Sequence, residues 1–462
     1  MLNLHAARIS VRAKYMVVNY LQPPESGDFE NLSIPAVRLE SEFEGFPERF
    51  SQLAPENQLF EKQFASNYFV RLHALKNAAY ESAKCQWSAT PILESITDYR
   101  KYPIGTEIAI VGTVFKDMKL KPNVLDELQK YSRVLDQYIV PPSVNGELTR
   151  STADSDFMCL EDAESRMQIT FESDSARQLL NRLCTGLIVA AKGSVTERGH
   201  FNLTDVCLPG TPPQPPLPLN RPSEYIVLIS GLNVGSPQSR PAALDLLKDF
   251  LIGVMDPIDV ASSTSRAIFL GNSIHLAASG LAIADTFFSE VAAVMPVELV
   301  PGPSDPTNFA MPQQPMHSSL FPLARQYSNF NGKVTNPCAC RVGGIDILGI
   351  SGQGVTEVLQ YTDLPSPLDA MELCLRARHL APTAPDTLAC YPITSDCDPL
   401  IIDAAPHVFV SGNSLGGCAC RVVDGVLCVS LSAFSQTAEV VVVNVADPLN
   451  DWRVVGFGAP DY

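Results

Sequence analysis

Residues 299–322 read LVPGPSDPTNFAMPQQPMHSSLFP, and the start of this stretch decides the fold of the C-terminal half. An apolar, strand-like approach ends at Val300 and runs directly into the turn-forming letters PGPSD. Continuous apolar runs are typical of strands buried on both faces, and Pro and Gly mark their ends. The stretch therefore predicts a buried strand whose tip carries a loop.

Two similar strands precede this one. They are YIVLIS at 225–230 and RAIFLGN at 266–272, and helical patterns at 242–255 and 279–295 separate the three. Because strand and helix alternate, this part of the chain is predicted to be a layered α/β domain.

More strands crowd the region after Val334: IDILGISG, PHVFVSGN, VLCVSLSAF and EVVVVNV. A helix is predicted among them at 366–380. It should begin with Ser366 as its N-cap and Pro367 at its first position, since both residue types favour those places.

The clearest boundary is PGTPPQPPLPLNRP, residues 209–222, which has seven prolines in fourteen positions. Proline cannot extend a helix or donate a hydrogen bond to a sheet. The segment is therefore predicted to be a stiff polyproline linker between two halves of about equal size.

The N-terminal half shows a different pattern. β-branched, alternating runs at 107–118, 158–172 and 186–208 predict short antiparallel strands. Strands of this kind suggest a small barrel, most commonly an OB-fold. The insert at 123–139 carries a helical pattern.

A helical segment is predicted before the barrel, within residues 47–83. Its apolar side chains recur every three or four residues and form a stripe: Phe60, Phe64, Tyr68, Leu72 and Leu75.

The charge balance limits the classes of function. The chain of 462 residues has a formal net charge of −17, and residues 385–462 contain nine acidic but only two basic side chains. A free-standing nucleic-acid binder needs the opposite sign, because phosphate contacts supply most of its affinity. A surface of this charge should repel DNA.

Cysteine usage and hydropathy indicate an intracellular protein. The twelve cysteines include two C-x-C pairs, at Cys338/Cys340 and Cys418/Cys420, but none has zinc-finger spacing. Free buried thiols in a reducing compartment are the favoured interpretation. The sequence shows no secretory signal and no apolar run of the ~18 residues that a membrane helix needs.

The predicted strand tips resemble those of calcineurin-like phosphoesterases, with the metal ligands replaced. A two-metal centre needs carboxylates, imidazoles and an amide at such tips. The loop PGNHD of active members is PGPSD here, and neither Pro303 nor Ser304 is a good ligand. The other expected ligand positions hold Gly231 and Asn233, Asn272 and His275, and Asn413 and Leu415. The sequence thus predicts no metal, no cofactor and no catalytic residue.

Three side chains near these motifs could still act as ligands. Asp305 before Pro306 is more typical of a turn or cap residue, and His275 of a helix end or the surface. His379 could fill a single imidazole position, but one histidine does not hold a metal pair.

These patterns predict a multidomain α/β (α+β) protein in five segments. They are an irregular N-terminal extension (1–42), a helical segment (43–85), an OB-fold domain (86–208), the Pro-rich linker (209–222) and a phosphodiesterase-like α/β sandwich lacking metal ligands (223–462).

From roughly residue 55 to its end, the chain resembles the B (second, small) subunits of DNA polymerase delta. The motifs that carry the resemblance are VGTVFKDMKLKP (111–122), SGLNVGS (230–236), PGPSDPTNFAMPQQPMHSSLFP (301–322), TNP (335–337), GISGQ (349–353), RHLAPTAPDTLACYP (378–392) and PHVFVSGN (406–413). The chain departs from the family in its first 40 residues, in the loop at 142–156 and in its C-x-C pairs.

The resemblance implies a nuclear, non-catalytic scaffold for DNA replication and repair synthesis. Such a scaffold would hold the cysteine-rich C-terminal module of the catalytic subunit and the third subunit, which binds the sliding clamp. It would also serve the catalytic subunit of polymerase zeta, and its contact with DNA would be weak or indirect. An acidic scaffold suits a basic partner module. The segments AMPQQPMHSSLFP (310–322) and HLAPTAPDTL (379–388) are candidate interfaces, with loops packed on their own domain as an equal alternative.

Two other functions remain open. One is an active metal-dependent phosphodiesterase or nuclease that depends on Asp305. The other is an OB-fold binder of single-stranded DNA, for which Lys116, Lys119 and Lys121 beside Phe115 offer a small foothold.

Overall fold

A computed structural model describes most of the chain. Side chains are described for residues 41–51, 63–121, 150–153, 155–219, 221, 223–254, 263–275, 280–393 and 397–458, and the backbone alone for 15–16, 143–144, 147–148 and 278–279. The predicted helix at 123–139 lies outside the described residues.

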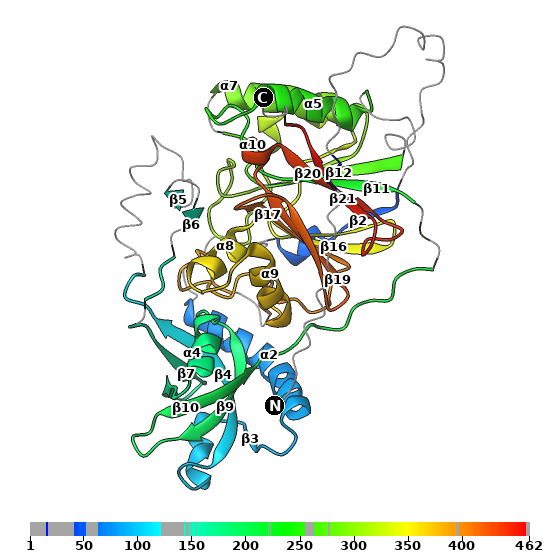
Figure 1. The fold of residues 1–462 in the computed structure, drawn as a ribbon. Coiled ribbons are helices and arrows are strands. Elements are labelled where there is room, and N and C mark those ends of the chain that lie inside the picture. Colours follow the sequence, from blue (N-terminus) through cyan, green and yellow to red (C-terminus); the bar gives the residue numbers. More distant parts are fainter. Residues whose placement is uncertain are drawn as a thin grey trace, which may run out of the picture.

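The N-terminal domain is a closed five-stranded barrel (Figure 1). Its elements are β4 (Glu107–Asp117), β7 (Phe157–Glu161), β8 (Arg166–Thr170), α4 (Asp174–Asn181), β9 (Ile188–Val195) and β10 (Phe201–Cys207). The strands pair in the order β4-β7-β8-β10-β9, and β4 also pairs with β9, which closes the barrel. This connectivity confirms the predicted OB-fold.

Short elements border the barrel. Strand β3 (Ile92–Leu93) pairs with β4 in parallel, and the 3₁₀ turn η3 (Ile96–Lys101) follows it. A two-stranded ribbon of β5 (Ser143–Val144) and β6 (Glu147–Leu148) lies in the long connection between β4 and β7.

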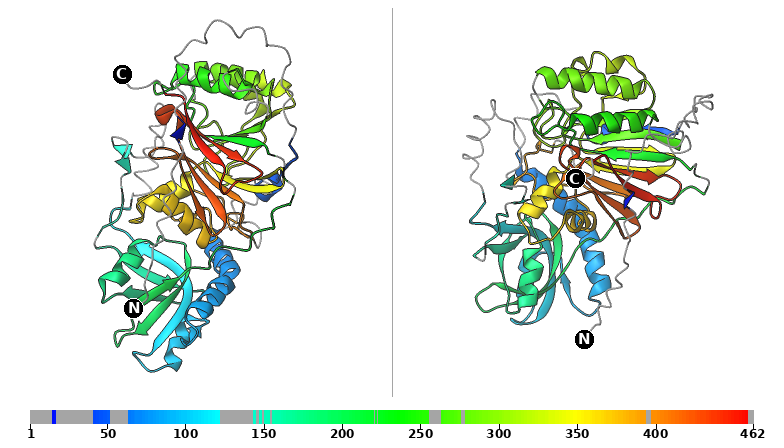
Figure 2. Two further views of the ribbon diagram at one scale, coloured as in Figure 1. Left: turned by 45° about the vertical axis from the view of Figure 1, so that its right-hand side comes forward. Right: turned by 45° about the horizontal axis from the view of Figure 1, so that its top comes forward.

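Helix α2 (Ala65–Gln86) packs along one side of the barrel, as both views of Figure 2 show. Its Leu72 and Leu75 are buried in an apolar cluster with residues of β4 and β9. The predicted stripe is confirmed there, whereas Phe64 is 49% exposed and Phe60 lies outside the described residues.

The segment before α2 differs from the prediction of helix and irregular extension. Phe43–Gly45 forms strand β2, which pairs antiparallel with β15 (Cys338–Val342), and Pro47–Arg49 forms the 3₁₀ turn η2. Within the extension, β1 (Tyr15–Met16) pairs in parallel with β21 (Trp452–Gly456). Both strands cover sheet edges whose backbone groups would otherwise stay unpaired.

The C-terminal domain contains two sheets packed face to face. The first has the order β1-β21-β20-β11-β12-β13-β14, and its remaining strands are β11 (Tyr225–Ile229), β12 (Thr264–Leu270), β13 (Val297–Val300), β14 (Phe330–Asn331) and β20 (Glu439–Asn444). The second has the order β18-β19-β17-β16-β15-β2, with β16 (Ile345–Ile350), β17 (Val408–Ser414), β18 (Ala419–Val423) and β19 (Val426–Ser432).

Helices cover the outer faces of both sheets (Figure 1). α5 (Pro241–Ile252) and α7 (Ala278–Ala292) lie on the first sheet, and α8 (Gln353–Gln360) and α9 (Pro367–Arg376) lie on the second. Shorter helical turns are η4 (Ser318–Leu320), η5 (Ala324–Gln326) and α10 (Phe434–Thr437). The predicted α/β sandwich is therefore confirmed.

The strand sequences explain the layers. In β11, Ile226 and Leu228 face the core between the sheets, while Val227 and Ile229 face the core beneath α5 and α7. A strand buried on both faces needs a continuous apolar run. At the start of α9, the Ser366 hydroxyl accepts a hydrogen bond from the Asp369 amide, which confirms the predicted N-cap.

One apolar cluster joins the two domains. It contains Ile108 and Leu180 of the barrel domain together with Leu359 of α8 and Leu375 of α9. The barrel is therefore packed against the C-terminal domain as well as tethered to it. Across the described part of the chain, no helix has the length and apolar character needed to cross a membrane.

Candidate functional site at the strand tips and the domain junction

Backbone hydrogen bonds hold the carboxyl ends of the adjacent parallel strands β11, β12 and β13 side by side. The Gly231 amide after β11 donates to the Gly271 carbonyl at 2.9 Å, and the Gly271 amide after β12 donates to the Val300 carbonyl at 3.0 Å. Parallel sheets place ligands at this edge. The structure thus brings the predicted tip positions together.

Gly231 fits here only because it has no side chain. Its φ is +64°, and a Cβ atom would lie 2.6 Å from the Ala433 Cβ and 2.7 Å from the Asn413 Oδ1. Asn413, at the tip of β17, donates to the carbonyls of Leu270 (3.2 Å) and Ser351 (2.9 Å). The space where a first carboxylate would point is filled by the chain itself.

The other asparagines bind neighbouring tips. The Asn272 Oδ1 accepts hydrogen bonds from the Ser304 amide (3.0 Å) and hydroxyl (2.9 Å), and the Asn233 Nδ2 donates to the Ser435 hydroxyl (2.9 Å). Asn233, Asn272 and Asn413 all have positive φ, between 47° and 53°. Asparagine tolerates this left-handed conformation better than most residues.

Asp305 is 5% exposed and fastens two tips. Its Oδ1 accepts from the Ile274 amide at 2.9 Å and its Oδ2 from the Gly302 amide at 2.8 Å. Both oxygens are therefore occupied by backbone donors, as expected for a turn residue.

The remaining predicted positions offer little for a metal. Pro303 has no side-chain donor atom, Leu415 is apolar, and His275 is half-buried just after the bridge between Val234 and Ile274. Within the described residues, no three His, Cys, Asp or Glu side chains are grouped so that they could hold a metal.

His379 lies at the domain junction, where it binds Asp398. Its Nε2 is 2.9 Å from the Asp398 Oδ2, and its Nδ1 accepts from the Ala381 amide at 3.1 Å. This geometry requires the neutral imidazole with its proton on Nε2. Burial and the charge of Arg71 lower the pKa of His379 to about 4.

Arg71 of α2 supplies the charge that balances Asp398. It is 1% exposed; its Nε lies 3.2 Å from the Asp398 Oδ2, and its other nitrogens donate to the carbonyls of Pro382 (2.8 Å) and Ala384 (2.9 Å). Sequence reasoning missed this residue. Its signal was an arginine on the apolar stripe, three positions after Tyr68 and next to Leu72.

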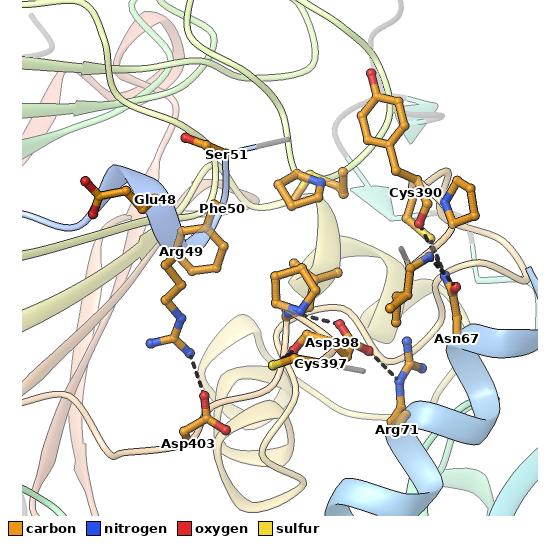
Figure 3. A pocket seen from close by; sticks show the side chains of 17 residues that line it. Glu48, Arg49, Phe50, Ser51, Asn67, Arg71, Cys390, Cys397, Asp398 and Asp403 are labelled. Carbon is orange, nitrogen blue, oxygen red and sulfur yellow. Dashed lines mark hydrogen bonds and ion pairs between the residues drawn. The ribbon is translucent and has the colours of Figure 1, made fainter. Parts of the chain in front are cut away.

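A cavity of about 340 Å³ lies beside Arg71 and Asp398. Figure 3 shows Asn67 and Arg71 of α2 on one side and Arg49, next to Asp403, on the other. Arg49 also donates to the Ile401 carbonyl at 2.6 Å. The cavity thus marks the place where the N-terminal segments meet residues 390–393 and 397–403.

The two candidate interface segments are mostly buried within this chain. In 310–322, Met311 is 2% and Phe321 is 1% exposed, and the Gln313 Nε2 donates to the Gly302 carbonyl at 3.2 Å. In 379–388, the carbonyls of Pro382 and Ala384 accept hydrogen bonds from Arg71. The alternative interpretation, loops packed on their own domain, is favoured; the exposed exceptions are residues 317–319 and Pro322.

Two of the three lysines of the possible DNA foothold serve the domain junction instead, whereas Lys119 is exposed. Lys116 is 5% exposed and donates to the Tyr361 carbonyl at 3.0 Å, and burial lowers its pKa. Lys121 binds Asp386 at 2.7 Å. The Phe115 ring is covered by the Arg166 guanidinium, 4.3 Å from its centroid. The structure therefore disfavours a DNA-binding stripe on the barrel.

All twelve cysteines are free, as predicted, but Cys85 and Cys397 are exposed rather than buried. Burial raises the pKa of Cys338 to about 12 and that of Cys418 to about 11. Thiols held protonated in this way are unreactive.

Comparison with protein families covers both domains. Residues 63–206 match the family described as DNA polymerase delta subunit OB-fold domain, and residues 226–419 match the B-subunit family of DNA polymerases alpha and epsilon. The DNA polymerase delta small subunit of Arabidopsis thaliana is 35% identical over 398 residues, which cover 81% of this chain and 86% of the relative. The chain belongs to the DNA polymerase delta small-subunit family.

Two further small-subunit relatives match over a similar length. The rice DNA polymerase delta small subunit is 32% identical over 81% of this chain and 87% of its own length. The Drosophila melanogaster DNA polymerase delta subunit 2 is 32% identical over 91% of this chain and 98% of its own length. The two family matches lie on either side of the Pro-rich linker at 209–222.

Proposed function

We propose that this protein is a non-catalytic accessory subunit of DNA polymerase delta, a scaffold that acts in DNA replication and repair synthesis. The observation that carries the proposal is the closed arrangement at the strand tips. The strand tips contact one another through Gly231, Asn272 and Asn413. The chain that contains this arrangement belongs to the small-subunit family. A phosphoesterase would present open metal ligands there.

The strand-tip positions are proposed to be degenerate metal-ligand positions. An active phosphoesterase would hold its ligands at the positions of Gly231, Asn233, Asn272, His275, Pro303, Ser304, Asn413 and Leu415. In this chain the amides and hydroxyls among them stabilise the loops. The framework then serves as a rigid platform without metal or other cofactor.

The proposed partners are other polymerase subunits. They are the C-terminal cysteine-rich module of the catalytic subunit, the third polymerase delta subunit, and the catalytic subunit of polymerase zeta. Contact with the sliding clamp would be indirect, through the third subunit. The names of the relatives support polymerase assembly. The net charge of −17 supports a basic partner module and only weak or indirect DNA contact. The place of action would be the nucleus.

Co-expression tests this proposal. The full chain and the C-terminal module of the catalytic subunit should elute together in size-exclusion chromatography, since family members would share a buried interface. A module whose metal-binding cysteines are replaced by serine serves as the control and should not co-elute. Separate elution of the unaltered pair would contradict the scaffold function.

Metal binding tests the enzymatic alternative. Native mass spectrometry in Mn²⁺ should show no stoichiometric metal, because Asp305 is engaged by two backbone amides. Stoichiometric binding that is lost in Asp305→Ala, with Mn²⁺-dependent phosphodiester hydrolysis, would support a nuclease instead.

A further inference from the structure

The Pro-rich segment 209–219, called the strap below, follows the outside of the molecule from the barrel to β11 (Figure 1). It contains no helix or strand. From residue 211 to residue 218, every residue is a proline or precedes one. Proline fixes φ near −65°, and the residue before a proline is restricted to extended conformations. The sequence thus enforces a polyproline II helix, with about three residues per turn.

One edge of the strap is fastened to the C-terminal domain. The Thr211 hydroxyl donates to the Asp424 Oδ2 at 2.8 Å, and the Gln214 Nε2 donates to the Pro406 carbonyl at 2.9 Å. The Leu217 side chain packs against the core between the two sheets. These three anchors are three residues apart, which is the spacing of one edge of a polyproline II helix.

The opposite side of the strap faces solvent. Pro213, Pro216, Pro218 and Leu219 are exposed, and Leu219 is 101% exposed. With Leu217 turned inward, the flanking pairs Pro215–Pro216 and Pro218–Leu219 each present an exposed side chain, although the Pro218 ring also lies against Gly344. Pro215 is half-buried, and its carbonyl accepts from the His407 Nε2 at 3.0 Å.

We propose that this outer edge is a docking site for a partner domain that recognises polyproline II through aromatic-lined grooves, as SH3 and WW domains do. Such grooves accept proline-containing pairs separated by one residue that points away from the groove. In the strap, Leu217 is the residue that points away from the groove, because it packs against the core of this chain.

Anchoring should favour this interaction. A free proline-rich peptide must still be ordered on binding, whereas the strap is already held at three points, so less conformational entropy is lost. The site lies away from the strand tips and does not depend on the scaffold function. It would link this subunit to a protein outside the polymerase.

The test is a titration of isotope-labelled SH3 and WW domains with the unlabelled full chain, followed by NMR. At least one of the two domain classes should show saturable shifts confined to its aromatic groove. The double variant Pro216→Ala/Leu219→Ala should bind at least about tenfold more weakly. Both side chains are exposed, so the variant should keep the unfolding temperature of the parent chain.

Pro322→Ala, at an exposed proline outside the strap, is the matched control and should bind like the parent chain. A free peptide of residues 209–222 completes the design. The proposal is overturned if the full chain shifts neither class of groove, whether or not the peptide does, since the anchors would then conceal the site. Equal affinity of the double variant and the parent chain would also overturn it.

Discussion

Gly231 shows how a single residue can allow strand tips to pack closely. Its φ of +64° is unfavourable for any side chain, and its missing Cβ makes room for Asn413 and Ala433. An aspartate at this position would therefore displace the side chains that join the two sheets. Glycine here permits the close packing of the two strand tips.

Substitution of Gly231 should measure that packing. We expect Gly231→Ala to lower the free energy of unfolding by about 2–4 kcal/mol, the sum of left-handed strain and overpacking. Gly199→Ala is the control, because Gly199 has φ +78° but nothing within 4 Å of the place that a Cβ would occupy. It should lose only about 1 kcal/mol. Urea unfolding measures both, and equal losses would show that the close approach at Gly231 is unimportant.

His379 makes stability depend on pH. Its folded pKa of about 4 lies below the ordinary value of 6.5, so the unfolded chain binds the extra proton more readily between these values. Stability is then complete above pH 6.5 and falls as the pH drops toward 4. The full contribution is on the order of 3 kcal/mol.

The variant His379→Gln cannot take up this proton. It should be less stable than the parent chain near pH 7, and the difference should shrink as the pH falls from 6.5 to 4.5. Thermal unfolding at several pH values measures this. His73→Gln, at an exposed position of α2, should leave the pH profile unchanged. If the difference in stability between His379→Gln and the parent chain stays constant with pH, the imidazole is not buried in its neutral form.

At the scale of elements, α2 depends on one buried cation. Arg71 reaches Asp398 and two carbonyls of the segment 379–388. Removing one partner of a buried ion pair leaves the other charge uncompensated, which costs about 3–5 kcal/mol. α2 is thus held by polar bonds to the C-terminal domain as well as by its apolar stripe.

We expect Arg71→Met to lower the free energy of unfolding by about 3–5 kcal/mol and to speed amide hydrogen exchange in α2 and in residues 397–403. Lys76→Met is the control on the same helix. Lys76 is half-buried and donates to the Glu94 carbonyl, so its loss should cost under about 1 kcal/mol. Unchanged exchange in the Arg71 variant would mean that α2 is held by its apolar contacts alone.

Local patterns predicted the elements that depend on nearby residues. The capped start of α9, the doubly buried β11 and the antiparallel strands β7 and β8 all carry their signals within a few positions. Strand β2 carries none, because three residues gain their partner from β15 almost 300 positions later. The same limit holds at the site. The motifs located the tip positions, but the bond from Asn413 to Ser351 required the fold.

At the scale of the whole molecule, the barrel and the C-terminal domain form one packed body. Ile108 and Leu180 share an apolar cluster with Leu359 and Leu375, and the buried Lys116 bond to Tyr361 crosses the same boundary. This shared core restrains the two domains, since domains joined only by a linker are expected to move relative to each other.

The two tryptophans of the chain can test this unity, because one lies in each domain. Trp87 follows α2 and is 7% exposed, and Trp452 starts β21. Trp87→Phe and Trp452→Phe each leave a single fluorophore. In each variant, the denaturant midpoint from fluorescence should equal the midpoint from far-ultraviolet circular dichroism, because a shared core unfolds cooperatively. Adding Arg71→Met should lower both midpoints together. In the Trp452→Phe variant, the fluorescence of Trp87 could instead change at a much lower denaturant concentration than the circular dichroism of the whole chain. That result would mean that the strap, rather than the shared core, holds the domains together.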